Sequence, residues 1–261
     1  MRTRIVSTSI LLLVLAIPLV AKKKDPEPDP AMAEITARGR MLYECDQAAW
    51  HATDALLKTN PPRELLGRYL PKKSDAGWIV GFGHLNQARD KFLVAYEATQ
   101  GANLQDFTVQ KFDPPHEDTS FYLAAARAID TALHEFQGEN RSYNAAVLPA
   151  PSNQLYVYIL PAQTKDDVFP LGGDVRYLLS PEGTSIIEKH QMHKSIIENP
   201  AGDNGAKTVA GVHTHVLTDV PEDSDVFHVL TRKPSVPEYI MTSKKGGYLV
   251  REDGTIIPWK R

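Results

Sequence analysis

Two histidines separated by a single residue, His213 and His215, are the residues whose types and spacing best suit chemistry in this sequence. On a β-strand both imidazoles project from the same face, about 6.6 to 7 Å apart along the chain. Asp225 follows at the start of an expected helix, where its carboxylate can return to the end of that strand. Two histidines, one carboxylate and a water form a zinc site whose fourth position is open for catalysis.

The order of elements around this motif resembles the JAB/MPN (JAMM) metallo-isopeptidase domain. A strand with His-x-His is followed by a proline-containing loop, Ser and Asp at the start of a helix, and two more strands. The resemblance implies that His213, His215 and Asp225 bind Zn²⁺, and that a metal-activated water cleaves a peptide or isopeptide bond. Two positions depart from the family pattern: Glu222 stands where a serine is usual, and Val216 replaces the proline after the second histidine.

The resemblance also implies a glutamate that acts as the general base, upstream of the zinc ligands. If Leu155–Leu160 is the first core strand, the positions before it, 152–154, are Ser, Asn and Gln, which cannot accept a proton at neutral pH. A different alignment uses Glu188, on the expected strand Thr184–His190, as the catalytic base. Without a base, hydrolysis loses a contribution on the order of 10²- to 10⁴-fold.

Other histidines offer alternatives. His228 lies three positions after Asp225, on the same helix face, and is a reserve ligand. His190 and His193 are interpreted as surface histidines beside the sheet, because a spacing of three sends strand residues to opposite faces. A His-x-His pair also arises by chance and is often simply hydrogen-bonded to a loop.

The elements that position this motif follow from hydrophobic periodicity. Steps of three and four residues predict helices over 31–59, 119–136 and 224–230, the second with Leu133 on its inward face. Alternating apolar residues predict a hairpin, 78–85 with 91–97. Further strands are predicted at 155–160, 174–179, 184–190, 208–215, 238–242 and 248–251. The expected fold is α+β: a helical N-terminal half with a small hairpin, and a C-terminal mixed β-sheet with flanking helices.

We expect the chain to divide into four regions. Residues 1–21 combine early arginines with an apolar run and predict a signal peptide or, if uncleaved, a membrane anchor. Residues 22–30, KKKDPEPDP, form a charged, proline-rich linker. Residues 31–145 are expected to form the helical and hairpin region, and the resemblance implies a JAB/MPN-like domain over residues 146–261. The protein is therefore expected to be exported, periplasmic or extracellular, with membrane contact only through an uncleaved N-terminal segment.

The overall composition narrows the possible partners. With Lys+Arg 29 and Asp+Glu 32 the net charge is -3, so there is no basic excess for binding nucleic acid. The single cysteine, Cys45, excludes an internal disulfide and a cysteine-rich zinc site. The sequence thus favours an exported zinc-dependent hydrolase acting on a protein or peptide. The alternative is a catalytically inactive protein-binding or envelope-associated module on the same fold.

Overall fold

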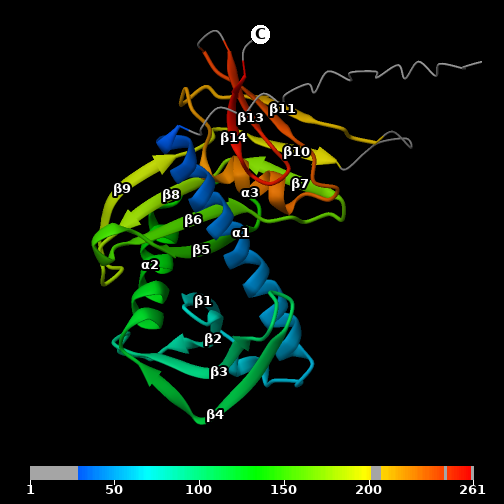
Figure 1. The fold of residues 1–261 in the computed structure, drawn as a ribbon. Helices are drawn as coiled ribbons and strands as arrows, with labels where there is room; N and C mark the ends of the chain where they lie inside the picture. Colours follow the sequence, from blue (N-terminus) through cyan, green and yellow to red (C-terminus); the bar gives the residue numbers. More distant parts are fainter. Residues whose placement is uncertain (1–28, 201–206, 244–245, 260–261) are drawn as a thin grey trace, which may run out of the picture.

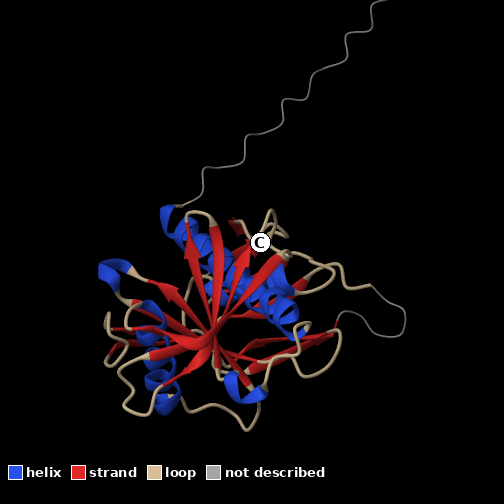
Figure 2. Ribbon diagram, turned by 90° about the horizontal axis from the view of Figure 1, so that it is seen from below, coloured by secondary structure: helices blue, strands red, loops and turns tan. Residues whose placement is uncertain are grey.

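The computed structural model describes residues 29–200, 207–243 and 246–259, so the expected signal peptide and most of the linker lie outside the described residues. Within these ranges the chain is mostly β, with four sheets, 39% strand and three α-helices (Figure 1). The expected α+β fold with a helical N-terminal half is therefore wrong. After the first helix, α1 (Pro30–Leu57), the chain continues as strands. Figure 2 shows strands as the larger part of the described chain, with the helices around them.

The first sheet is antiparallel, with the strands in sequence order. Its members are β1 (Arg68–Ser74), β2 (Gly77–Leu85), β3 (Phe92–Gln100) and β4 (Phe107–Asp118). The expected hairpin is confirmed as β2 and β3, but it is only the centre of this sheet. Sequence periodicity missed β4 because this strand is polar and contains Pro114 and Pro115. As an edge strand, β4 tolerates prolines, which lack the N–H of the hydrogen-bond ladder.

The second sheet is also antiparallel, with the order β5-β6-β8-β9. Its members are β5 (Tyr143–Pro149), β6 (Leu155–Pro161), β8 (Val175–Leu179) and β9 (Ile186–Gln191). The proposed boundary between residues 145 and 146 falls within β5. One hydrophobic core contains side chains from both sides of that boundary, including Phe92 and Tyr122 with Val157 and Tyr177.

The helix α2 (Phe121–Glu135) packs against this core and confirms the expected second helix. Ala125 and Ile129 are buried, as the periodicity predicts. Leu133 is 41% exposed, so its expected inward position is wrong. The neighbouring Ala132 is fully buried there instead, since the closely packed face of α2 is built largely from alanines.

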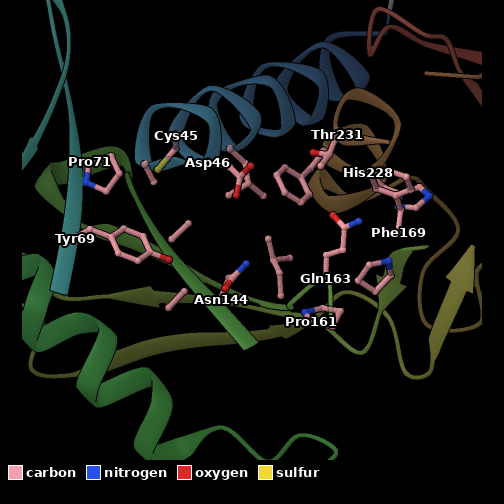
Figure 3. A pocket seen from close by; sticks show the side chains of 17 residues that line it. Cys45, Asp46, Tyr69, Pro71, Asn144, Pro161, Gln163, Phe169, His228 and Thr231 are labelled. Carbon is pink, nitrogen blue, oxygen red and sulfur yellow. The ribbon is translucent and has the colours of Figure 1, made fainter. Parts of the chain in front are cut away.

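The helix α1 extends from the C-terminal strands to the first sheet (Figure 1). The side chain of Asp29 caps its N-terminus by accepting a hydrogen bond from the N–H of Ala31. A stripe including Leu42, Cys45 and Leu56 is buried, as expected for this helix. Between α1, β1, the end of β6 and a third helix, α3 (Asp223–Thr231), the chain encloses a cavity, shown in Figure 3.

The C-terminal part contains two smaller sheets. The strands β7 (Val168–Gly172) and β10 (Ile196–Pro200) pair with each other. A four-stranded sheet has the order β11-β12-β13-β14. Its members are β11 (Gly211–Thr214), β12 (Glu238–Met241), β13 (Gly247–Val250) and β14 (Ile256–Trp259). The strands β11 and β12 are parallel, so α3 serves as the crossover between them.

Two short 3₁₀ turns, Arg63–Leu65 and Pro151–Asn153, complete the described elements. Within the described ranges, none of the helices has the length and apolar character needed to cross a membrane.

Candidate metal centre

Four buried side chains converge on one point: His193, His213, His215 and Asp225. One ligand atom from each lies within 4.8 Å of all the others. The Nε2 atom of His215 lies 2.9 Å from that of His193 and 3.1 Å from that of His213. The Asp225 carboxylate lies 3.1 to 3.2 Å from all three Nε2 atoms. The structure thus joins the three ligands expected from sequence to a fourth, His193.

Three of these side chains are positioned by the β11-α3-β12 unit. His213 lies on β11, and His215 follows directly after the strand, where its N–H donates to the carbonyl of Met241 at 2.8 Å. Asp225 lies in the first turn of α3. Its Oδ2 accepts a hydrogen bond of 2.6 Å from the N–H of Glu222, the residue that precedes the helix. This bond fixes the orientation of the carboxylate toward the histidines.

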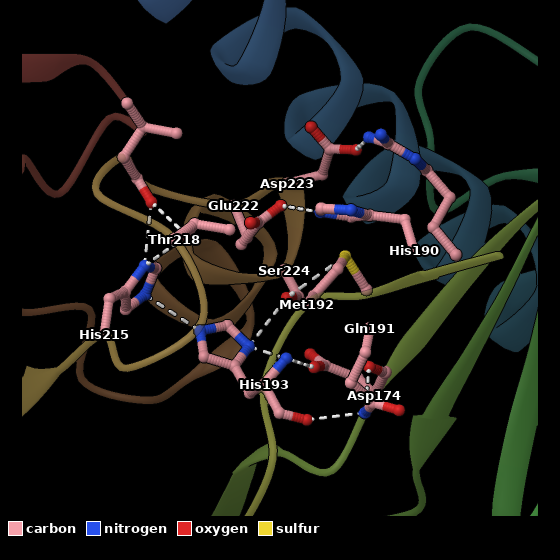
Figure 4. Close-up of polar contacts among 12 residues, drawn as sticks. Asp174, His190, Gln191, Met192, His193, His215, Thr218, Glu222, Asp223 and Ser224 are labelled. Atoms are coloured by element: carbon pink, nitrogen blue, oxygen red, sulfur yellow. Dashed lines mark hydrogen bonds and ion pairs between the residues drawn. The ribbon is translucent and has the colours of Figure 1, made fainter. Parts of the chain in front are cut away.

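The fourth side chain, His193, comes from the segment after β9 (Figure 4). Its backbone N–H donates to Oδ1 of Asp174 at 3.0 Å, and its Nδ1 lies 2.9 Å from the same oxygen. The amide of Gln191 donates to the carbonyls of Asp174 and His193. The turn before β8 therefore holds both the backbone and the ring of His193.

Each of the three histidines has an acceptor for its outer ring nitrogen. For His193 the acceptor is Oδ1 of Asp174. Nδ1 of His213 lies 2.9 Å from Oε1 of Glu238. Nδ1 of His215 lies 2.7 Å from the carbonyl oxygen of Val220. Because carboxylate and carbonyl oxygens only accept, each Nδ1 carries the hydrogen. When such a ring loses its second proton, it turns the lone pair of Nε2 toward the centre, which is the arrangement typical of metal-binding histidines.

The separations fit a metal ion. A tetrahedral zinc ion with bonds of about 2.0 to 2.1 Å places neighbouring ligand atoms about 3.3 Å apart. The distances from His215 to the other two histidines and from the Asp225 oxygens to all three are 2.9 to 3.2 Å, which is close to this value. Oδ1 of Asp225 is buried and lies 3.2 Å from Nε2 of His193 and 3.1 Å from Nε2 of His213. An ion at the centre would bind this oxygen and separate the three inward lone pairs, so the group could hold a metal ion.

The electrostatics of the centre favour a positive charge. Burial alone lowers the pKa of His193, but the charges of Asp225 and Asp174 and hydrogen bonds to them raise it to about 11. Burial likewise opposes the positive form of His213, while its bonds to Asp225 and Glu238 raise its pKa to about 9. Burial would raise the pKa of Asp225, but the three histidines hold it well below its usual value. In the absence of a metal, protons supply this charge, so metal binding releases protons.

A second group of charges holds the start of α3 in place. Asp223, which is fully buried, accepts hydrogen bonds from Arg38 at 3.0 Å and Arg176 at 2.5 Å. It also accepts one from the hydroxyl of Tyr158 at 2.8 Å. These partners belong to α1, β8 and β6. The first turn of α3, and with it Asp225, is therefore fixed against the second sheet.

The expectation that His190 and His193 are surface histidines is wrong for His193. His193 is only 9% exposed and belongs to the centre. His190 does point elsewhere, with Nε2 2.9 Å from Oε2 of Glu222. The only signal that could have identified His193 was the turn before β8 containing Asp174. Its pairing with His193 depends on strand order, which spacing does not reveal.

The expected base and the reserve ligand lie outside the group of four. Glu188 is exposed on β9, where its backbone is opposite Leu178. His228 is buried on α3, and burial lowers its pKa to about 4. Neither is among the side chains that converge.

Comparison with known proteins adds no relative: no family model, no curated protein and no solved structure matches this chain. The fold and the site together define a mostly-β protein with a buried group of three histidines and one aspartate. That group could hold a metal ion.

Proposed function

We propose that this is an exported zinc-binding protein in which four side chains hold one ion and fix the C-terminal strands to the second sheet. One observation carries the proposal. Three imidazole Nε2 atoms and one carboxylate converge, and each imidazole has an acceptor for its Nδ1 hydrogen. A buried centre of inward lone pairs is costly without a cation, so the arrangement is best explained by one.

Zinc is the ion we propose because the donor set and its geometry suit it. Imidazole nitrogen with one carboxylate oxygen, in four-coordinate geometry, is a common zinc environment. The ligands come from three segments: the segment after β9, the strand β11 with its extension, and the start of α3. One ion therefore cross-links segments that are distant in the sequence. We expect it to contribute directly to the folding free energy.

The same donor set favours a module without hydrolytic activity. Sites with four protein ligands are characteristic of structural zinc, whereas catalytic zinc keeps one position for water. His193 fills the position that the sequence analysis gave to water. We therefore favour the reading in which the JAB/MPN-like domain binds a protein or an envelope component and has lost its activity.

A second candidate function is a zinc-dependent hydrolase of peptide or isopeptide bonds. Two differences between His193 and the other three ligands support it. The His193 side chain is 10% exposed, against 3%, 1% and 0% for His213, His215 and Asp225. The other three ligands are those that the family resemblance implies. If His193 leaves, the ion could supply Lewis acidity and a bound water. Glu188 would then have to act as the base.

The test combines coordination with activity on the full mature chain. Cobalt(II) replaces zinc and reports coordination through its visible absorption. We expect a four-coordinate spectrum and no cleavage of a casein or ubiquitin-fusion substrate, for the wild type and for His193→Ala. Cleavage that appears in His193→Ala and disappears on adding Glu188→Gln would support the hydrolase instead. Glu182→Gln, an exposed glutamate in the turn before β9, is the matched control.

A further inference from the structure

The cavity between α1, β1, β6 and α3 has features of a ligand site separate from the metal centre (Figure 3). Its volume is about 150 Å³. Its walls are mostly apolar and include Leu42, Ala49, Leu160, Phe169 and Phe227. A dry apolar cavity of about this size accepts a molecule as large as benzene. The space therefore suits a single ring or a branched aliphatic group.

One carboxylate lies in this apolar wall. The Asp46 side chain projects from α1 into the cavity (Figure 3). Among the described residues, its one hydrogen bond is from the amide of its neighbour Gln47, at 3.2 Å. Burial raises the pKa of Asp46, which shows that its charge is poorly solvated. Asp46 is half-buried, and a carboxylate with a single neutral donor retains unfilled acceptor capacity.

A second polar atom of the lining also lacks a partner. Oγ1 of Thr231, on α3, is buried and has no hydrogen-bond partner within the described part of the chain. Such atoms are uncommon in native proteins, and an unseen ligand is one physical reason for them. Thr231 and Asp46 line the same cavity, so a ligand with a donor group could satisfy both.

The charged residues that line the cavity determine whether it favours a cationic or an anionic ligand. Among the described residues that line the cavity, Asp46 is the one acidic residue, and none is a lysine or an arginine. The other titratable side chains of the lining are neutral at pH 7, because burial raises the pKa of Cys45 and Tyr69 and lowers that of His228 to about 4. The cavity therefore favours a cationic group over an anionic one.

We propose that this cavity binds a small primary amine with a body the size of one ring, its ammonium group paired with Asp46. The apolar walls enclose the body of the molecule, and the ammonium donates to the carboxylate and to Thr231. A charge-assisted hydrogen bond in a site of low polarity is worth enough to discriminate an amine from the corresponding alcohol. The proposal does not depend on zinc.

Benzylamine is the probe, with benzyl alcohol as its neutral match. Titration of the full mature chain by calorimetry and ligand-detected NMR is expected to show saturable binding of benzylamine at pH 7. Asp46→Asn keeps the shape of the side chain and should weaken benzylamine at least ten-fold, with little effect on benzyl alcohol. Asp54→Asn, an exposed aspartate of the same helix, should leave both affinities unchanged.

A second variant tests the cavity itself. Ala49→Phe places a ring in the space and should abolish binding of both compounds, with circular dichroism confirming that the variant is folded. The proposal is overturned if benzylamine does not saturate. It is equally overturned if Asp46→Asn binds benzylamine as tightly as the wild type does.

Discussion

Replacing His193 by alanine tests whether the metal centre has four protein ligands or three. Structural zinc sites bind with about 10 to 16 kcal/mol of apparent free energy at pH 7. Divided over four ligands, one ligand contributes about 2.5 to 4 kcal/mol. We therefore expect the zinc Kd of His193→Ala to rise about 10²- to 10³-fold. At a free zinc concentration near 100 times the wild-type Kd, the variant also loses up to about 2.7 kcal/mol of unfolding free energy.

The assay is competition with a chelating dye of known affinity, together with urea unfolding at fixed free zinc. The matched control is His190→Ala, because His190 is three residues away but contacts Glu222 instead of the centre. Its zinc affinity should equal that of the wild type. If His193→Ala binds zinc as tightly as His190→Ala does, His193 is not a ligand and the four-coordinate site is refuted.

Three further predictions concern the surroundings of α3. Asp223→Asn removes the charge that pairs with two arginines and should lower the free energy of unfolding in urea by about 3 to 5 kcal/mol. The control Asp253→Asn, at an exposed ion pair, should lower it by less than about 1 kcal/mol. Gly39→Ala would place a Cβ 2.5 Å from that of Val226. Despite a gain in helix propensity, this clash should lower the unfolding free energy by about 1 to 3 kcal/mol, and an unchanged value would contradict the close approach of α1 and α3. His228 has a pKa of about 4 in the folded chain and 6.5 as its ordinary value. As the pH falls between these values the unfolded chain takes up a proton that the folded chain does not, so the metal-free wild type loses stability there. His228→Gln should lack this component, worth at most about 3 kcal/mol, and equal pH slopes for both proteins would show the reasoning to be wrong.

The three helices and most central strands could be predicted from sequence because each has a clear hydrophobic period. The periodicity of α1 matches its buried face, that of α2 does so except at Leu133, and α3 begins within one residue of its predicted start. The fold class was wrong because the missed strands carry no such signal. β4 is an exposed, proline-containing edge, and β5 spans the boundary that was expected between residues 145 and 146.

The residues of the candidate site, like the elements of the fold, could be predicted only in part from the sequence. The alternation of a strand was enough to predict that His213 and His215 face one point, and the start of a helix was enough to predict Asp225. His193 could not be predicted, since it reaches the centre only through the turn at Asp174 and the order of the sheet. Glu188 was chosen by alignment of strands, and the structure places it on an exposed face of β9.

The zinc content of the purified mature protein tests the central claim most directly. Elemental mass spectrometry should find one zinc per chain in the wild type and a clearly lower content in His213→Ala, which loses one of the four side chains of the group. A wild type without stoichiometric metal, or a metal content that His213→Ala leaves unchanged, would contradict the claim that these four side chains form a zinc site.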